Sequence, residues 1–169
     1  MKLQPALIFG EHMVLQRGGP IPVWGRSAGG DTVTVALGGA SVQAKAEGGL
    51  WEALLPPMEA AEGLEMRISS QLTGESIVFQ DVAVGEVWLA GGQSNMEFLL
   101  KYDSQAQEMY QAGPDRLLRF FRYPLACFTG CMEKDAFPDD GFWRQWGGEE
   151  DRGMFSAAAA YMGQMLREK

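Results

Sequence analysis

The first 80 residues alternate between apolar and polar positions in short runs. The clearest run is 32–37, Thr-Val-Thr-Val-Ala-Leu, where β-branched residues recur at alternate positions. Gly38-Gly39 follows it and Gly48-Gly49 comes ten residues later, and both pairs are typical of hairpin turns. The other alternating or short apolar runs are 41–46, 50–55, 64–68 and 76–79. Short strands about ten residues apart, separated by glycine turns, predict an all-β sandwich domain over residues 1–80.

The pattern changes after residue 80. Residues 82–90 are mostly apolar, which is typical of a strand covered on both faces. Gly91 and Gly92 allow a sharp turn and a close approach of other groups to the backbone. Residues 95–112 have a loosely amphipathic helical pattern that ends at Gly113-Pro114. The order of strand, turn and helix indicates an α/β domain that begins near residue 81.

The remainder of the chain predicts one more strand and one more helix. Residues 117–123 fit a second strand, and 126–153 are rich in glycine, proline and acidic residues, as in a long loop. Residues 155–166 are alanine-rich and apolar, which predicts a buried helix. A doubly wound domain needs about five parallel strands, and 81–169 has room for roughly two βα units. We therefore expect an incomplete α/β domain over 81–169.

Ser94 is the candidate for chemistry. A hydroxyl where a turn enters a helix lies among backbone N–H groups without intrahelical partners, and it can act as an acyl-accepting nucleophile if a general base, usually histidine, is near. The same segment also fits a capping box, with Ser94 as N-cap and Glu97 reaching back from the third helical position. The two interpretations are compatible, and the spacing does not choose between them.

Two motifs resemble those of a known family. Gly85-Glu86-Val87-Trp88 followed by Gly92-Gln93-Ser94-Asn95-Met96-Glu97 resembles the nucleophile block of the sialate O-acetylesterase family, which are carbohydrate esterases of the SGNH-hydrolase superfamily. Met13-Val14-Leu15-Gln16-Arg17, with Val23-Trp24-Gly25 after it, resembles the N-terminal signature of that family. Ala90-Gly91 departs from the Cys-Ser that the family often has there.

The resemblance covers about residues 9–166 and implies a serine esterase. It implies that Ser94 attacks the acetyl carbonyl of an O-acetylated sialic acid or related sugar, and that its backbone N–H is one oxyanion donor. Gln93 and Asn95 would shape the turn and contact the sugar. The base of the family belongs to an Asp-x-x-His pair far downstream of the serine, and this sequence has no Asp-x-x-His. We expect the chain to carry the nucleophile but to be inactive alone.

Three explanations of this arrangement stay open. The chain could be a truncated or fragmentary esterase. It could be one half of an enzyme completed by a second chain. It could also be a partial domain kept for a non-catalytic role. The last would be a carbohydrate-binding or interaction module built on the sandwich. A partial sheet with an uncovered helix face would also favour self-association.

Some aromatic residues need an assignment. His12 is the single histidine, and it lies at the start of the N-terminal signature. We expect a partly buried loop histidine hydrogen-bonded to backbone rather than the base for Ser94. Trp51 and Trp88 lie in apolar strand patterns, so we expect them in the core rather than on a sugar-stacking platform.

Composition limits the partners. Apolar residues make up 46% of the chain, which is enough for a packed core, and the formal charge of −8 argues against nucleic acid and anionic membranes. No apolar run is long enough to span a membrane, and residues 1–9 make a poor signal peptide, so a cytoplasmic or a trimmed secreted form is expected. Cys127 and Cys131 with one histidine are a weak metal signal. We expect no metal or cofactor, and free thiols or a local disulfide.

Overall fold

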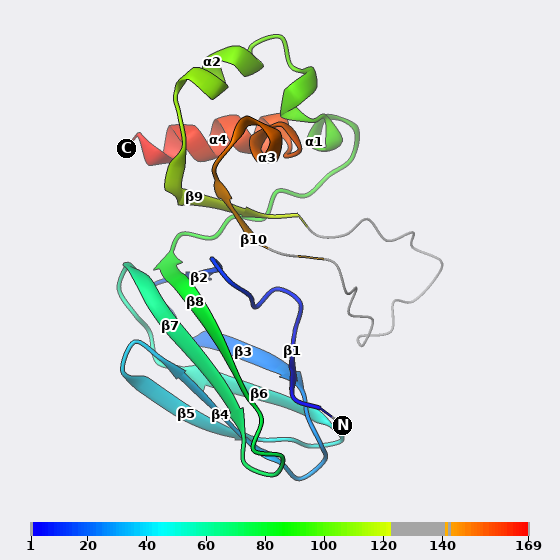
Figure 1. The fold of residues 1–169 in the computed structure, drawn as a ribbon, viewed down its shortest axis with the longest axis vertical. Coiled ribbons are helices and arrows are strands. Elements are labelled where there is room, and N and C mark those ends of the chain that lie inside the picture. The colour runs from blue at the N-terminus through cyan, green and yellow to red at the C-terminus, as the bar shows by residue number, and fades with distance from the viewer. Residues whose placement is uncertain (1, 123–140, 142, 169) are drawn as a thin grey trace. The chain divides into compact units, whose positions relative to one another are not determined.

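The computed structural model describes residues 2–122, 141 and 143–168, which form two compact units (Figure 1). The described part of the first unit is 2–87 together with 141, and that of the second is 88–122 with 143–168. Cys127 and Cys131 lie outside the described residues. Within the described ranges, no helix is both long and apolar enough to cross a membrane.

The first unit consists of β-strands in two sheets (Figure 1). An antiparallel three-stranded sheet has the order β1 (Gln4–Pro5), β3 (Ile21–Arg26), β6 (Leu50–Leu55). A five-stranded sheet has the order β2 (Val14–Gln16), β8 (Ser76–Gly85), β7 (Ala61–Ser70), β4 (Thr32–Leu37), β5 (Ala40–Lys45). The second sheet is mixed, because β2 runs parallel to β8 while the other neighbours are antiparallel.

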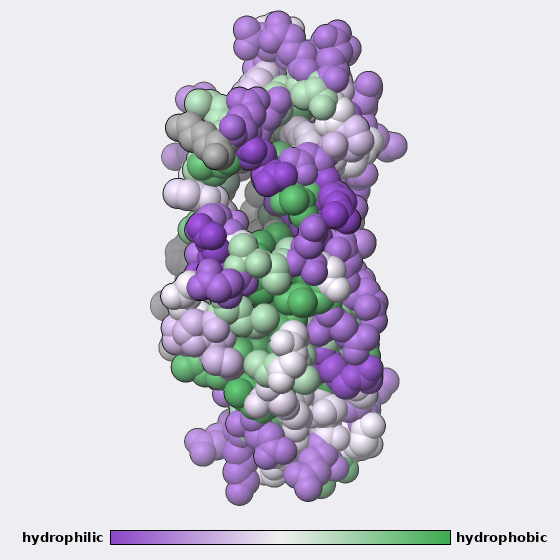
Figure 2. All heavy atoms as spheres, turned by 90° about the vertical axis from the view of Figure 1, so that its left-hand side faces the viewer, coloured by the Kyte–Doolittle hydropathy of each residue, from purple (hydrophilic) through white to green (hydrophobic). Residues whose placement is uncertain are grey.

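Alternating side chains of these strands build the core. In β4 the buried residues are Val33, Val35 and Leu37, at every second position. β6 shows the same period, with Trp51 only 3% exposed. The predicted strands 32–37 and 50–55 and the core position of Trp51 are therefore confirmed. Figure 2 shows that part of the apolar side chains stays exposed on one face of this unit, flanked by hydrophilic ones.

Gly25 is required by the packing of its neighbours. A Cβ at this position would lie 2.3 Å from the carbonyl oxygen of Gln4 and 2.8 Å from the ring of Trp51. Only glycine lets β1 and the indole approach the backbone of β3 this closely. The Trp-Gly pair of the N-terminal signature thus has a packing reason.

A buried carboxylate joins two connections of the first unit. Asp31 is 1% exposed, and its Oδ2 accepts hydrogen bonds from the hydroxyls of Ser27 and Ser70, the latter at 2.6 Å. Its Oδ1 accepts from the backbone N–H of Leu72 at 2.9 Å. The cluster ties the β3–β4 connection to the β7–β8 turn.

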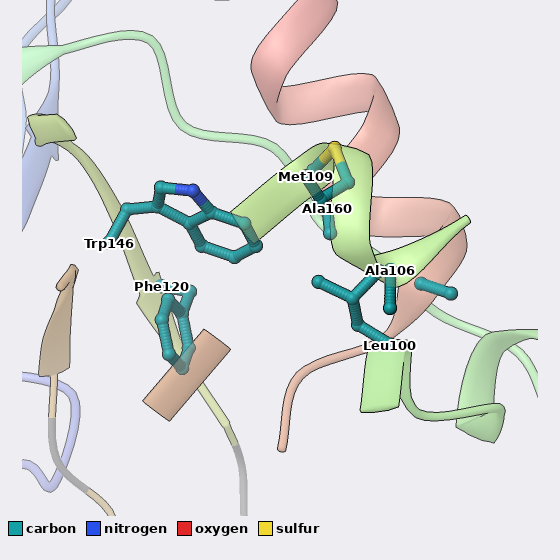
Figure 3. Close-up of a cluster of buried hydrophobic side chains, with 7 residues drawn as sticks. Leu100, Ala106, Met109, Phe120, Trp146 and Ala160 are labelled. Carbon is teal, nitrogen blue, oxygen red and sulfur yellow. The ribbon is translucent and has the colours of Figure 1, made fainter. Parts of the chain in front are cut away.

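The second unit is smaller and mixed (Figure 1). Its elements are α1 (Ser94–Glu97), the 3₁₀ helix η1 (Leu100–Tyr102), α2 (Ala106–Gln111), β9 (Asp115–Phe121), β10 (Trp143–Trp146), α3 (Glu149–Gly153) and α4 (Ala157–Arg167). β9 pairs antiparallel with β10. Figure 3 shows the apolar cluster at its centre: Leu100, Ala106, Met109, Phe120, Trp146, Ala157 and Ala160.

The buried side chain of Arg152 joins α3 to the C-terminal end of α2. Its side chain is 3% exposed, and Nη1 donates to the carbonyl oxygens of Met109 (3.0 Å), Tyr110 (3.3 Å) and Gly113 (3.1 Å). These carbonyls close the C-terminal end of α2, where a cation is favoured by the helix dipole. The guanidinium also lies 5.9 Å from the ring centroid of Trp146.

The strand expected over 82–90 is wrong in its second half. β8 ends at Gly85, Trp88 is 61% exposed and Leu89 is 97% exposed. A strand forms only where a neighbour satisfies its backbone groups, and no described strand pairs with 86–90. Trp88 is therefore not a core residue in the described structure, contrary to expectation.

Three further expectations for the second unit need correction. The helix predicted over 95–112 is divided into α1, η1 and α2. The end of the predicted loop, from 143 to 153, contains β10 and α3. The predicted C-terminal helix exists as α4, but only Ala157 and Ala160 of it are buried. The rest of the predicted loop lies almost entirely outside the described residues.

Candidate functional site

Ser94 lies on a segment that is tied down at both ends. The main chain of residues 88–92 makes no hydrogen bond within the described part of the chain. The first bond after this gap runs from the Met96 N–H to the Gln93 carbonyl oxygen at 2.7 Å and closes the turn into α1. Gln93, Ser94 and Asn95 are all exposed.

The backbone of Ser94 is in an unusual conformation. Its φ is +28°, one of three positive values among the described non-glycine residues. Such a conformation costs of the order of 1–3 kcal/mol and is concentrated at functional sites. A strained serine where a turn enters a helix is the geometry that presents a nucleophilic hydroxyl in many hydrolases.

The glycine before the turn contributes through close packing. Gly92 has φ +151°, and a Cβ there would lie 2.7 Å from Cγ of Met96. This matches the close approach expected from the glycine pair. At Gly91 the equivalent space is open, so only Gly92 is required by packing.

The capping box predicted from Ser94 and Glu97 is wrong. The N-cap of α1 is Gln93, Ser94 is the first helical residue, and no side chain caps the helix. Within the described chain the Ser94 hydroxyl makes no hydrogen bond. In the described structure the hydroxyl therefore does not cap α1.

Downstream, the segment is pinned to the beginning of α4. The N–H of Leu100 donates to the Phe155 carbonyl oxygen at 2.9 Å, and the N–H of Ala157 donates to the Phe98 carbonyl oxygen at 2.9 Å. The hydroxyl of Ser156 accepts from the Ala159 N–H at 3.4 Å and caps α4. The end of α1 is thus held by the first turn of the longest helix in the unit.

A second tie runs from α4 to the η1–α2 connection. The Tyr161 hydroxyl donates to Asp103 Oδ1 at 2.9 Å. Burial and this carboxylate raise the pKa of Tyr161 to about 12. The phenol therefore stays protonated and keeps donating to Asp103 into the alkaline range.

His12 lies in the first unit and pairs with a carboxylate. Its Nδ1 is 2.7 Å from Asp81 Oδ2, and both residues have positive φ. Nδ1 therefore has a carboxylate partner. No motif indicated this pair, because its members are far apart in the chain. In the described ranges no three His, Cys, Asp or Glu side chains gather as metal ligands would.

The N-terminal signature lies beside the first residues of the nucleophile block in the first unit. β2 carries Val14–Gln16 and pairs in parallel with the end of β8, with Gln16 opposite Gly85. The N-terminal signature therefore lies beside the residues from which the chain departs toward Ser94. The sequence motifs themselves did not indicate that Gln16 pairs with Gly85.

Comparison with known proteins gives a consistent result. A scan of protein-family profiles finds no match. The sialate O-acetylesterase of Rattus norvegicus is 30% identical over 126 residues, which is 68% of this chain and 23% of the rat protein. That of Homo sapiens is 38% identical over 105 residues, 54% of this chain and 20% of the human protein.

A solved structure agrees over nearly the whole chain. A carbohydrate acetylesterase from Xanthomonas citri superposes with a TM-score of 0.87 at 31% identity, and covers 99% of this chain and 38% of that protein. Over this length the chain is a relative of the sialate O-acetylesterases. The chain spans about a fifth to a quarter of the length of the curated relatives that it matches.

Proposed function

We propose that Ser94 is the nucleophile of an esterase that removes O-acetyl groups from sialic acid or a related sugar. The observation that carries the proposal is the exposed serine at φ +28°, with its hydroxyl unengaged in the described chain. Support comes from relatives that are acetylesterases over the same region.

The proposed reaction is two-step acyl transfer. Ser94 Oγ attacks the acetyl carbonyl while its proton passes to a histidine, and the sugar hydroxyl leaves with a proton from that histidine. The Ser94 N–H stabilises the oxyanion, and the exposed side chains of Gln93 and Asn95 contact the sugar. Water then releases acetate and restores the serine. We assign the histidine to polypeptide outside these 169 residues, because the resemblance places the base in an Asp-x-x-His pair and this sequence has none.

We further propose that the second unit is the first part of a flavodoxin-like α/β domain of the SGNH-hydrolase type, and that it follows a β-sandwich. Helix α4 supports this, because Ala158, Met162, Met165 and Leu166 form an exposed apolar stripe at helical spacing. Met165 is 62% exposed and Met162 is 41% exposed. The solved relative is much longer than this chain. The proposed occupant of the stripe is therefore further polypeptide of the same hydrolase domain.

Acetate release tests the proposed activity. The polypeptide extended to the length of its relatives should hydrolyse O-acetylated sialic acid, and Ser94→Ala should lower kcat by more than about 1,000-fold. Ser104→Ala is the matched control, because Ser104 is an exposed serine of the same unit. The 169-residue chain alone should show only background hydrolysis of p-nitrophenyl acetate. Turnover by this chain that Ser94→Ala abolishes would overturn the assignment of the base to another segment.

A further inference from the structure

Two exposed aromatic side chains follow the helix that carries Ser94. Phe98 is 43% exposed and Tyr102 is 66% exposed, and their ring centroids lie 6.4 Å apart with an interplanar angle of 51°. Ser94 and Phe98 are four residues apart across the single turn of α1, so their side chains start from the same face, with Cβ atoms about 5–6 Å apart. The aromatic pair therefore begins beside the serine, within the same unit.

The backbone that carries this pair is fixed by the rest of the second unit. The Phe98 carbonyl oxygen accepts from the Ala157 N–H at 2.9 Å. Directly after the second ring, Asp103 Oδ1 accepts from the Tyr161 hydroxyl at 2.9 Å. Leu100, between the two rings, is fully buried. A fixed backbone holds the exposed rings in place, which reduces the entropy that a ligand loses when it binds them.

A cation lies against the second ring. Lys101 Nζ is 5.0 Å from the ring centroid of Tyr102, within the range of a cation–π contact. Among the described residues the ammonium donates to Met154 Sδ at 3.2 Å, a weak acceptor that uses one of its three N–H bonds. A Cβ on Gly153 would lie 3.2 Å from Lys101 Cβ, so α3 packs closely against the start of this side chain. The ammonium is therefore held at the edge of the aromatic pair.

The aromatic rings and the ammonium together match the chemistry of an acidic sugar. A pyranose ring has an apolar C–H face that packs on an aromatic ring, and a sugar carboxylate forms a charge-assisted hydrogen bond with an ammonium. The formal charge of the chain is −8, which repels an anion in general. A fixed ammonium beside the rings is the local feature that favours a carboxylate here.

We propose that Phe98, Tyr102 and Lys101 form the subsite for the ring of an acidic sugar whose O-acetyl group is presented to Ser94. The aromatic rings contact the C–H face of the sugar, and Lys101 Nζ donates to the sugar carboxylate. The proposal rests on the proposed function and deepens it, because it assigns recognition of the sugar acid to residues that follow the nucleophile. The subsite takes no part in acyl transfer itself.

A nuclear magnetic resonance titration tests the subsite without using activity. In the dilute 169-residue chain, the methyl glycoside of sialic acid should shift the ring signals of Phe98 and Tyr102 with a Kd of about 1–10 mM. Phe98→Leu with Tyr102→Leu should weaken binding by about tenfold or more, whereas Tyr102→Phe keeps the ring and should weaken it by less than about threefold. Trp24→Leu is the matched control, because Trp24 is an exposed aromatic residue of the first unit.

Two outcomes of this titration would overturn the subsite. One is the absence of any shift at both rings up to about 50 mM of the glycoside. The other is a shift that occurs in the 169-residue chain and vanishes in the extended polypeptide, because further polypeptide would then cover the rings.

The role of Lys101 is tested by removing charge from each partner in turn. Lys101→Met should weaken binding of the glycoside by about tenfold and binding of its carboxyl methyl ester by less than about twofold, because the ester has no negative charge. Lys45→Met is the control, since Lys45 is an exposed lysine on β5 of the first unit. Equal losses for the acid and the ester would contradict the assigned ion pair.

Kinetics connects the subsite to the reaction. In the extended polypeptide, Phe98→Leu with Tyr102→Leu should lower kcat/KM for an O-acetylated sialic acid about tenfold more than for p-nitrophenyl acetate, which has no sugar ring. Equal reductions for the two esters would show that the rings do not select the sugar. If Ser94→Ala keeps its activity while the ring signals shift as expected, the proposed function fails and the subsite remains. If Ser94→Ala abolishes turnover while the ring signals do not respond, the subsite fails and the proposed function remains.

Discussion

The backbone N–H of Ala157 donates to the carbonyl oxygen of Phe98 at 2.9 Å. Phe98 directly follows α1, and Ala157 is the first residue of α4. The helix that carries Ser94 therefore ends where a later helix begins. Because α1 has only four residues, its stability must come from such tertiary contacts rather than from its own backbone bonds.

Weakening the cap of α4 should loosen the serine segment. Ser156→Ala removes the hydroxyl that accepts from the Ala159 N–H, a change that costs about 1 kcal/mol at an N-cap. Hydrogen exchange should become faster at Leu100 and in the first turn of α4, and Ser156→Asp should restore it. Protection at Leu100 that stays the same in Ser156→Ala would show that the two helices are not coupled.

Removing the buried guanidinium should destabilise the second unit alone. Arg152→Met leaves the carbonyl oxygens of Met109, Tyr110 and Gly113 without their donor, which should cost about 1–3 kcal/mol. Amide exchange in α2 and α4 should speed up while β4 and β7 stay protected. The exposed Arg67→Met is the control. An effect no larger than that of the control would show that the Arg152 hydrogen bonds do not stabilise this unit.

The carboxylate of Asp31 should make the first unit sensitive to acid. Burial alone would raise its pKa, but hydrogen bonds from Ser27, Ser70 and the Leu72 N–H lower it below the ordinary value of 3.8. A lowered folded-state pKa stabilises the protein above the unfolded value, and this contribution is lost as the pH falls from about 4 through the folded-state pKa.

Asp31→Asn should therefore be less stable than the wild type at pH 7 and should lose less stability below about pH 4. Urea unfolding followed by the circular dichroism of the sheet, repeated over a pH series, measures both effects. Glu52→Gln, at an exposed position on β6, is the control. An acid slope unchanged by Asp31→Asn would refute this role.

The exposed stripe of α4 should cause self-association when its proposed cover is absent. The 169-residue chain should form oligomers that grow with concentration in sedimentation velocity, and Met162→Lys with Met165→Lys should shift it toward monomer. Leu72→Lys is the control, since Leu72 is 64% exposed on the first unit. A wild-type chain that stays monomeric at every concentration would remove the evidence for an uncovered face.

The sequence predicted local structure well where each strand carries its own pattern. Residues 32–37 and 50–55 alternate so regularly that burial on one face follows directly, and the structure has strands with those bounds. Residues 87–90 are apolar too, but a strand also needs a partner. Nothing in the residues 86–90 themselves shows whether a neighbouring strand is present.

The candidate site was predicted only in part, because its conformation also depends on contacts between segments that lie apart in the sequence. The helix pattern over 95–112 gave no sign that Phe98 and Leu99 would turn extended to bond with 155–157. Asp103 interrupts the helix locally, because its carboxylate accepts from the Gln105 N–H at 2.8 Å and stabilises a turn. The positive φ of Ser94 and the hydrogen bond from the Val87 N–H to the Gln16 amide oxygen are not revealed by any spacing in the sequence.

Covalent labelling tests the assignment of Ser94 most directly. The extended polypeptide would be treated with a fluorophosphonate, which forms a stable adduct with an activated serine, and mapped by mass spectrometry. We expect one adduct on the peptide that contains Ser94, none in Ser94→Ala and an unchanged adduct in Ser104→Ala. An adduct on a different residue, together with acetyl-ester turnover that persists in Ser94→Ala, would contradict the account.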